Sequence, residues 1–433
     1  MDESKQLDLH SLPGPESIRR EVLPNGIVFL GRENFSSPSV VLSGYLWVGA
    51  LQEKPNQAGL ATMTAASLMR GTQERTFEQI YESVESIGAR LSFSAGKHST
   101  SFSGKALAED LGTLLDLLLE VLRQPSFPKR QVDRLRAEIL TSLAIRDQET
   151  GARADLAFNR LIYPGHPYSV PTDGYKETVT NLTVAHLRAF HRAHYRPGGM
   201  VISVVGGVKG EDAAESVTKR FADWNANGRA VQLELPGIEK LKGLHRDHIS
   251  LEGKSQTDVV MGVPGPPRSD PDYLAAALAN NILGRFGMYG RIGDVVREEA
   301  GLAYYAYSSL VGGHGPGPWQ IVAGVSPKNL DRAIELIRKE MRKMSTRSPS
   351  QTELEDNQAN FIGRLPLQLE SNEGVAGALV NAERHALGLD YYQRYPGLVR
   401  SFTAKDILRV ARRFLDSDNM AIASAGSNGR PQQ

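Results

Sequence analysis

Short apolar runs separated by turn residues open the chain in the pattern of a β-sheet. The segments 21–23 and 27–30 flank Pro24-Asn25-Gly26, and Asn-Gly between two apolar runs is a strong hairpin signal. Residues 39–50 predict a further strand, and residues 90–105 alternate in the manner of two strands. The first hundred residues therefore predict a largely antiparallel sheet.

Apolar positions at helical spacing lie between and after these strands. A helix is expected over residues 59–69 with Gly71 as its C-terminal cap, and Thr76 with Gln79 forms the capping box of the next helix. Residues 109–123 carry leucines that recur with the period of a core-facing helix, at positions 111, 114, 115, 118 and 122.

The second half repeats this order of elements. Leu111 and Leu330 begin corresponding amphipathic helices 219 residues apart, and Pro128 and Pro349 begin the next helices 221 residues apart. Such a steady offset indicates an internal duplication. The repeated strands and helix are expected over residues 304–309, 319–325 and 329–344, and another buried strand over 200–205.

This organisation predicts an α+β protein with two homologous domains, each a mainly antiparallel sheet with helices packed on it. We expect a polar leader over residues 1–17, an N-terminal domain over 18–225, a linker over 226–243 and a C-terminal domain over 244–428.

Composition narrows the classes of function. The 433 residues carry a formal net charge of +1, without the excess of basic residues typical of nucleic-acid binders. Cysteine is absent, which excludes disulfides and thiolate ligands and leaves His, Asp and Glu as metal ligands. No apolar stretch has the length of a membrane span or a signal peptide, so we expect a cytoplasmic protein that contacts neither membrane nor nucleic acid.

One predicted helix resembles a known catalytic motif, but other residues stand at the catalytic positions. Residues 59–72 read GLATMTAASLMRGT and resemble the zinc helix of the pitrilysin/insulysin metallopeptidases, also called inverzincins, whose pattern is GLAHxxEH followed by GT. In that family two histidines bind zinc and the glutamate between them is the general base. The matching positions here are Thr62, Ala66 and Ala65.

The resemblance also implies a third ligand, a glutamate further along the chain, whose position here is Ser142. Glu138 lies one helical turn before it, but a single carboxylate does not replace the missing histidines. We therefore expect this chain to bind no metal and no other cofactor, and zinc hydrolysis by the chain alone is not expected.

The second half keeps a family signature. Residues 272–309 include ILG, a glycine-rich turn, a helix ending in RE and then GLAY, and in the family an arginine and a tyrosine of this motif reach the active site. The matching residues are Arg297 and Tyr304. A tyrosine hydroxyl can donate to a developing oxyanion, and a guanidinium can hold substrate carbonyls. The alternative is structural, with Arg297 capping a helix and Tyr304 packing as a strand tyrosine.

A relocated metal site is the least favoured possibility. His186, His191 and His194 share one predicted helix, but no acidic ligand lies within it. We interpret these histidines as packing residues.

The resemblance covers residues 20–425, including GHPYSVPTDGY and HYRPGGMVISVVGGV. Similar proteins, among them the mitochondrial processing peptidases, form two-subunit clamshells around peptides, and in some bacterial pairs one subunit carries zinc and the other the arginine and tyrosine. The resemblance thus implies the non-zinc subunit of a heterodimeric peptidase, paired with a homologous HxxEH-bearing chain, or a homodimer when isolated. The alternative is an inactive structural or peptide-binding homologue. Peptide would pair with an edge strand, with residues 91–95 as the candidate.

Overall fold

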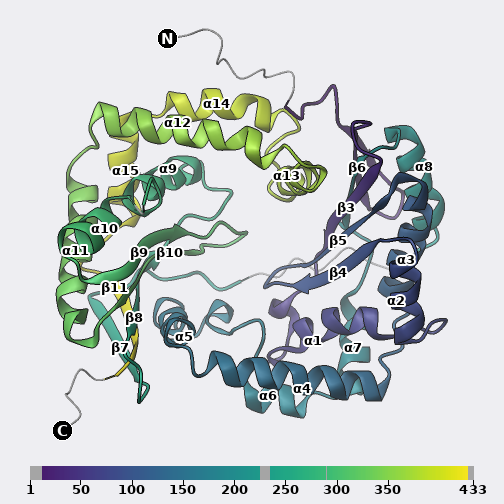
Figure 1. Ribbon diagram of the computed structural model, residues 1–433, viewed down its shortest axis with the longest axis horizontal. Helices are drawn as coiled ribbons and strands as arrows, with labels where there is room; N and C mark the ends of the chain where they lie inside the picture. The colour runs from purple at the N-terminus through teal and green to yellow at the C-terminus, as the bar shows by residue number, and fades with distance from the viewer. Residues whose placement is uncertain (1–11, 225–234, 289, 428–433) are drawn as a thin grey trace. The chain divides into compact units, whose positions relative to one another are not determined.

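The computed structural model describes residues 12–224, 235–288 and 290–427, which fold into two compact units (Figure 1). Unit 1 comprises Met1–Leu143, Pro171–Glu234 and Leu365–Arg394, and unit 2 comprises Ala144–Val170, Leu235–Arg364 and Tyr395–Gln433. Most of the expected leader, and residues 226–234 of the expected linker, lie outside the described residues. The units combine separate stretches of sequence and cut across the contiguous domains expected over 18–225 and 244–428.

The sheet of unit 1 has the strand order β1-β2-β6-β3-β5-β4 among the described residues. Neighbouring strands are antiparallel except β2 and β6, which are parallel. The strands are β1 (Arg19–Val22), β2 (Val28–Glu33), β3 (Ser39–Leu46), β4 (Arg90–Ala95), β5 (Thr100–Leu107) and β6 (Val201–Gly206).

Strand β6 shows why this sheet is covered on both faces. Every residue of β6 is buried, and its apolar side chains alternate between two separate clusters. Ile202 and Val204 belong to the large core, whereas Val201 and Val205 belong to the smaller core that contains Leu379. Because successive strand residues point to opposite faces, a continuous apolar strand needs helices on both sides.

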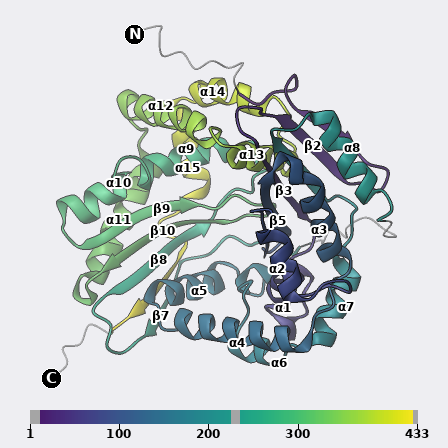
Figure 2. The same cartoon turned by 45° about the vertical axis from the view of Figure 1, so that its right-hand side comes forward.

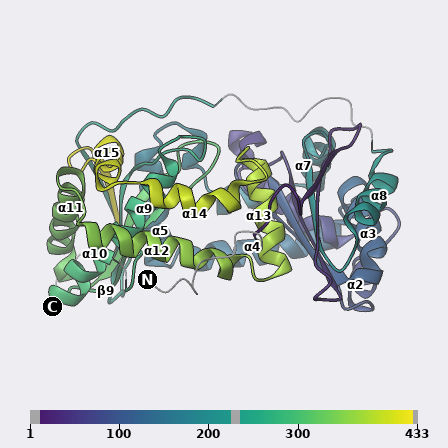
Figure 3. The same ribbon diagram turned by 90° about the horizontal axis from the view of Figure 1, so that it is seen from above.

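Helices α2, α3 and α8 lie on one face of this sheet and α13 on the other (Figure 1). The view from above shows α3 beside α8 (Figure 3). The helices of unit 1 are α1 (Leu60–Ser67), α2 (Phe77–Glu85), α3 (Leu111–Arg123), α6 (Lys176–Asn181), α7 (Val184–His194), α8 (Gly210–Phe221) and α13 (Asn372–Arg384).

The sheet of unit 2 has the order β7-β11-β8-β10-β9 among the described residues, and β7 and β11 are its parallel pair. Figure 2 shows β9, β10 and β8 as successive neighbours, with α5 beyond β8. The strands are β7 (Leu244–Ser250), β8 (Thr257–Pro264), β9 (Ala303–Leu310), β10 (Pro318–Val325) and β11 (Met420–Gly426).

One face of this second sheet shares a core with α9, α11 and α15, whereas α5 packs on β11, β8 and β7. The helices of unit 2 are α5 (Thr150–Ile162), α9 (Tyr273–Gly284), α10 (Gly290–Gly293), the π-helix η8 (Asp294–Glu299), α11 (Leu330–Thr346) and α15 (Ala404–Phe414). The unit boundaries fall within α4 (Lys129–Arg146), α12 (Gln351–Gln368) and α14 (Tyr391–Ser401).

The two sheets have the same order once β1 is set aside, with β2, β6, β3, β5 and β4 corresponding to β7, β11, β8, β10 and β9. Corresponding strands start at similar separations, such as Ser39 and Thr257 or Val201 and Met420. The expected α+β fold with an internal duplication is therefore confirmed, and by this correspondence α9 is the counterpart of α1.

Each unit takes one helix from the other half of the sequence. Helix α13 packs on β6 and β3 of unit 1, and its Val375, Ala376 and Leu379 complete the smaller core. Helix α5 in turn packs on the strands of unit 2. This exchange was not predicted from the sequence.

Local sequence signals agree well with the elements. The side chain of Thr76 accepts the N–H of Gln79 and the Gln79 side chain accepts the N–H of Thr76, so the predicted capping box is present. Gly71 ends the segment that begins with α1, at a φ of 142°. Helix α3 buries every leucine of the predicted stripe.

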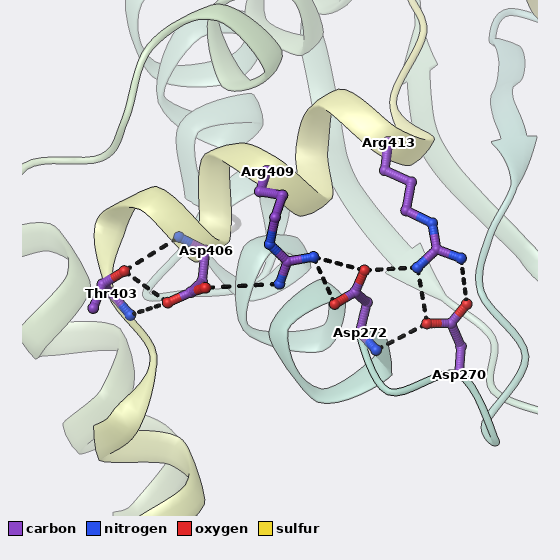
Figure 4. Close-up of polar contacts among 6 residues, drawn as sticks. All are labelled: Asp270, Asp272, Thr403, Asp406, Arg409 and Arg413. Atoms are coloured by element: carbon purple, nitrogen blue, oxygen red, sulfur yellow. Dashed lines mark hydrogen bonds and ion pairs between the residues drawn. The ribbon is translucent and has the colours of Figure 1, made fainter.

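A charged network fixes α15 to the start of α9 (Figure 4). Arg413 donates to Asp270 at 2.8 Å and to Asp272 at 2.6 Å, and Arg409 donates to both oxygens of Asp272 at 2.8 Å. Burial alone would raise the pKa of Asp272, but the hydrogen bonds from both arginines outweigh it and lower that pKa. The network joins segments about 140 residues apart within unit 2.

Candidate functional site

Helix α1 begins at a glycine held by a half-buried carboxylate. Gly59 has a φ of 96°, in the left-handed region that favours glycine. The carboxylate of Glu53 accepts the N–H groups of Ala61 at 2.6 Å and Gly59 at 3.1 Å, at the end of the helix where negative charge is favourable. The effect of burial on the pKa of Glu53 is larger than the opposing effect of these hydrogen bonds. Burial therefore raises the pKa of Glu53 to about 7.

The three motif positions of α1 carry no group that could bind a metal in the family manner. Ala65 is 1% exposed, and Ala66 is partly buried and packs against the large core of unit 1. The hydroxyl of Thr62 donates to the carbonyl of Thr172 at 2.6 Å. This face of the helix therefore presents methyl groups and one hydroxyl that is already engaged.

Ser142 lies on α4, where its hydroxyl donates to the carbonyl of Glu138 one turn earlier at 3.2 Å. The carboxylate of Glu138 accepts from Arg70 at 2.6 Å and from Arg134 at 3.2 Å. Hydrogen bonding from Arg70 is the main reason why the pKa of Glu138 is lowered. Glu138 is thus an ion-pair partner on the surface of this helix.

These residues do not fit a zinc ion. Zinc in the family requires imidazole and carboxylate donors, and alanine methyl groups offer none. Throughout the described residues, no group of three or more His, Asp or Glu side chains is arranged to hold a metal.

The three helix histidines are engaged by the protein. His191 shares a hydrogen bond of 2.8 Å with the carbonyl of Leu122, and burial lowers its pKa to about 4. His186 Nδ1 accepts the N–H of Thr183 at 3.3 Å as part of a helix cap. Burial and then Arg196 lower the pKa of His194. Within the described part of the chain, these histidines form no metal-binding group.

Arg297 lies on the π-helix η8, seven residues before Tyr304. Its Nε atom lies 3.5 Å from a carboxylate oxygen of Glu298, and 31% of its side chain is exposed. The carbonyl of Arg297 accepts the N–H of Gly301, whose φ of 61° turns the chain into β9. The backbone of Arg297 thus helps to set where β9 begins.

Tyr304 is the second residue of β9 and is 85% exposed. Strand β9 is an edge of its sheet among the described residues, because it pairs with β10 alone. The structural alternative, in which Tyr304 packs like the other strand tyrosines, does not describe this residue. A phenol at an open strand edge is well placed to donate to a bound molecule.

The neighbouring tyrosine belongs to a buried network that the sequence analysis missed. Asp258 is 3% exposed and accepts hydrogen bonds from Tyr305 at 2.5 Å, from Gln256 at 2.7 Å and from the hydroxyl of Thr150. A lone acidic residue at the start of an apolar strand, TDVVMGVP, was the available signal. The network connects β8, β9 and α5 beside Tyr304.

Two sequence profiles match most of the chain. Residues 32–167 match the profile described as "Insulinase (Peptidase family M16)", and residues 181–361 match "Peptidase M16 inactive domain". The first match contains α1 and Ser142, and the second contains Arg297 and Tyr304. The chain belongs to the M16 family of peptidases, so the resemblance seen in the sequence is confirmed.

Curated relatives span nearly the same length. An uncharacterized zinc protease of Streptomyces coelicolor is 26% identical over 85% of this chain and 80% of the relative. The uncharacterized zinc protease YmxG of Bacillus subtilis is 23% identical over 95% of this chain and 99% of the relative.

Solved structures share the whole fold. A "peptidase M16 inactive domain" from Pseudomonas fluorescens is 26% identical with a TM-score of 0.88, covering 95% of this chain and 98% of that one. A protease from Helicobacter pylori has a TM-score of 0.87 at 19% identity, covering 96% and 100%. This chain is thus an M16 protein of the protease-like type. None of the helices in its described part has both the length and the apolar character needed to cross a bilayer.

Proposed function

We propose that this chain is the non-zinc subunit of a heterodimeric zinc metallopeptidase that degrades or processes peptides. A homologous HxxEH-bearing chain supplies the metal and the general base. This chain supplies Arg297, Tyr304 and half of the peptide-enclosing chamber, and it binds no metal itself.

One contrast carries the proposal. The fold matches a family member over nearly its whole length, yet Thr62 and Ala66 stand where the metal-binding histidines of α1 would be, and Ala65 stands where the general base would be. In the same chain the motif tyrosine, Tyr304, is 85% exposed at a strand edge. The exposed hydroxyl at this motif position can reach a bound molecule, as the proposed role requires.

The side chains of Arg297 and Tyr304 can both interact with carbonyl groups of a peptide during hydrolysis. Water attack on a carbonyl carbon places negative charge on oxygen, and the Tyr304 hydroxyl can donate a hydrogen bond to that oxygen. Arg297 provides fixed positive charge and several N–H donors for a neighbouring substrate carbonyl. Neither group activates water, so both act only together with a partner that does.

Substrate recognition is proposed at the open edge of unit 1. Strand β4 ends the sheet of the described residues and pairs with β5 alone, so the backbone N–H and carbonyl groups of alternate residues within 91–95 have no strand partner. An extended peptide added there would be held main chain to main chain, which tolerates many sequences.

The test is reconstitution. This chain and a homologous HxxEH-bearing chain from the same genome are purified separately, mixed and assayed for cleavage of a fluorogenic peptide, with zinc measured in each chain. We expect activity from the mixture alone and zinc in the partner alone. Full activity of the isolated chain, or stoichiometric zinc in it, would falsify the proposal.

An inactive structural or peptide-binding homologue is the second candidate, favoured by the similarity to a solved structure described as an inactive domain. It predicts peptide binding without cleavage in any mixture. Cleavage that depends on both Tyr304 and the partner would exclude this candidate.

A further inference from the structure

A cavity of about 860 Å³ in unit 1 is lined by four arginines. Arg123 ends α3, and Arg188, Arg192 and Arg196 follow one another at intervals of four along and just beyond α7. Residues four apart lie on one face of a helix, so Arg188 and Arg192 share one face of α7. Arg196 follows the C-cap Tyr195 and lines the same cavity from outside the helix. The volume is within the range of small-molecule sites.

The protein neutralises only part of this charge. Arg123 pairs with Asp223 at 2.8 Å, although the carboxylate of Asp223 is 73% exposed. Arg188 donates to the carbonyl of Ser126 at 2.8 Å. Arg192 is exposed and makes no hydrogen bond or ion pair with any residue that the structure describes.

Helix dipoles offset part of the positive charge of these arginines. Helices α3 and α7 both end at the cavity, and each C-terminus is equivalent to about half a negative charge. Together with Asp223 these helix ends hold part of the positive charge, and the exposed guanidinium of Arg192 is the group that a bound anion would meet.

The rest of the lining is neutral and includes several rings. Phe127, Tyr195 and Trp224 are buried residues that line this cavity. The ring of His191 stacks on Tyr195 with centroids 4.7 Å apart, and its lowered pKa, about 4, keeps it uncharged near neutral pH. The cavity thus joins a cationic rim to an apolar wall.

We propose that this cavity binds a small phosphomonoester, with its dianionic phosphate on Arg188 and Arg192 and its apolar or aromatic body against the part of the lining that includes Trp224. Arginine recognises phosphate oxygens through paired N–H donors. The site uses none of the residues assigned to peptide cleavage.

The experiment is calorimetric titration of the full chain with phenyl phosphate, above the second phosphate pKa of about 6. We expect saturable binding of one ligand per chain. Phenyl sulfate has the same shape but one negative charge and should bind at least about tenfold more weakly, the loss of one strong charge-assisted contact.

The variant Arg192→Gln should weaken the binding of phenyl phosphate by at least about tenfold. It removes no hydrogen bond or ion pair to a described residue, so its melting temperature should not change. Arg130→Gln is the matched control, because Arg130 is an exposed arginine of α4 that does not line the cavity. Absence of saturable binding, equal affinity for the sulfate, or an equal loss in Arg130→Gln would each overturn the assignment.

Discussion

The hydroxyl of Tyr305 donates to the buried carboxylate of Asp258 across an intervening strand, at 2.5 Å. Gly324 of β10 lies in register between them, opposite both residues. A Cβ atom at Gly324 would lie 2.6 Å from the Tyr305 ring and 2.9 Å from an Asp258 oxygen. Because Gly324 has no side chain, Tyr305 and Asp258 can reach each other across β10. Their hydrogen bond fixes the position of β9 next to Tyr304.

We expect Tyr305→Phe to destabilise unit 2 by about 1–3 kcal/mol, because a buried carboxylate loses a donor. Urea unfolding measures this change. Tyr304→Phe is the matched control, since the same atom is removed from a side chain that is 85% exposed, and it should change stability by less than about 0.5 kcal/mol. Equal effects of the two substitutions would contradict this assignment.

The raised pKa of Glu53 predicts that the stability of the protein depends on pH. Its pKa is raised from an ordinary 4.5 to about 7, so the native state holds the proton more tightly than the unfolded chain does. The stabilising contribution is then complete below about pH 4.5 and is lost as pH rises towards 7. A shift of this size corresponds to about 3 kcal/mol.

Glu53→Gln should remove this part of the pH profile, because an amide oxygen can still accept an N–H at the start of α1 but does not titrate. The measurement is the free energy of unfolding of both proteins at several pH values from 4 to 8. Other titrating groups contribute equally to both, so the difference isolates Glu53. Parallel profiles would show that its pKa is not raised.

Tyr304→Phe should lower kcat of the reconstituted peptidase by about 10²–10³-fold, the loss typical of one oxyanion donor, while KM changes little. This prediction rests on the proposed function. Tyr81→Phe is the control, because Tyr81 is another exposed tyrosine, on α2 of unit 1. A similar loss in both variants would indicate a general effect of removing surface phenols.

The network at α15 should contribute measurably to stability. Arg413→Gln removes contacts to both Asp270 and Asp272 and should cost about 1 kcal/mol, kept small because 48% of the Arg413 side chain is exposed. The cost should shrink at high salt, which screens such pairs. Arg332→Gln breaks the pair with Glu335, whose members are 65% and 67% exposed, and should cost less than about 0.5 kcal/mol. Equal costs for the two variants would argue against the network.

The sequence predicted those features that depend on short segments. The Thr76 capping box and the leucine stripe of α3 depend on residues within one or a few turns, and both are present. The fold class followed from the steady offset between the halves, because duplicated sequence with the same apolar pattern folds into the same sheet order.

Features that depend on distant segments were not predicted. The contact between Asp258 and Tyr305 requires the register of three strands, and no local pattern specifies it. The arginines of α7 were visible at intervals of four, but the same helix was interpreted through its histidines. The placement of Arg297 and Tyr304 in the peptidase reaction remains a prediction for the reconstituted enzyme.

The exchange of α5 and α13 has a consequence for the history of this protein. A duplication first produces two autonomous copies, and either can later be lost, shuffled or encoded by a separate gene. Once each sheet is covered by a helix encoded in the other copy, a cut at the linker leaves both fragments with a bare apolar face. The two repeats can therefore no longer be separated in evolution without loss of folding. Separately expressed fragments should be recovered in soluble form only when they are made together.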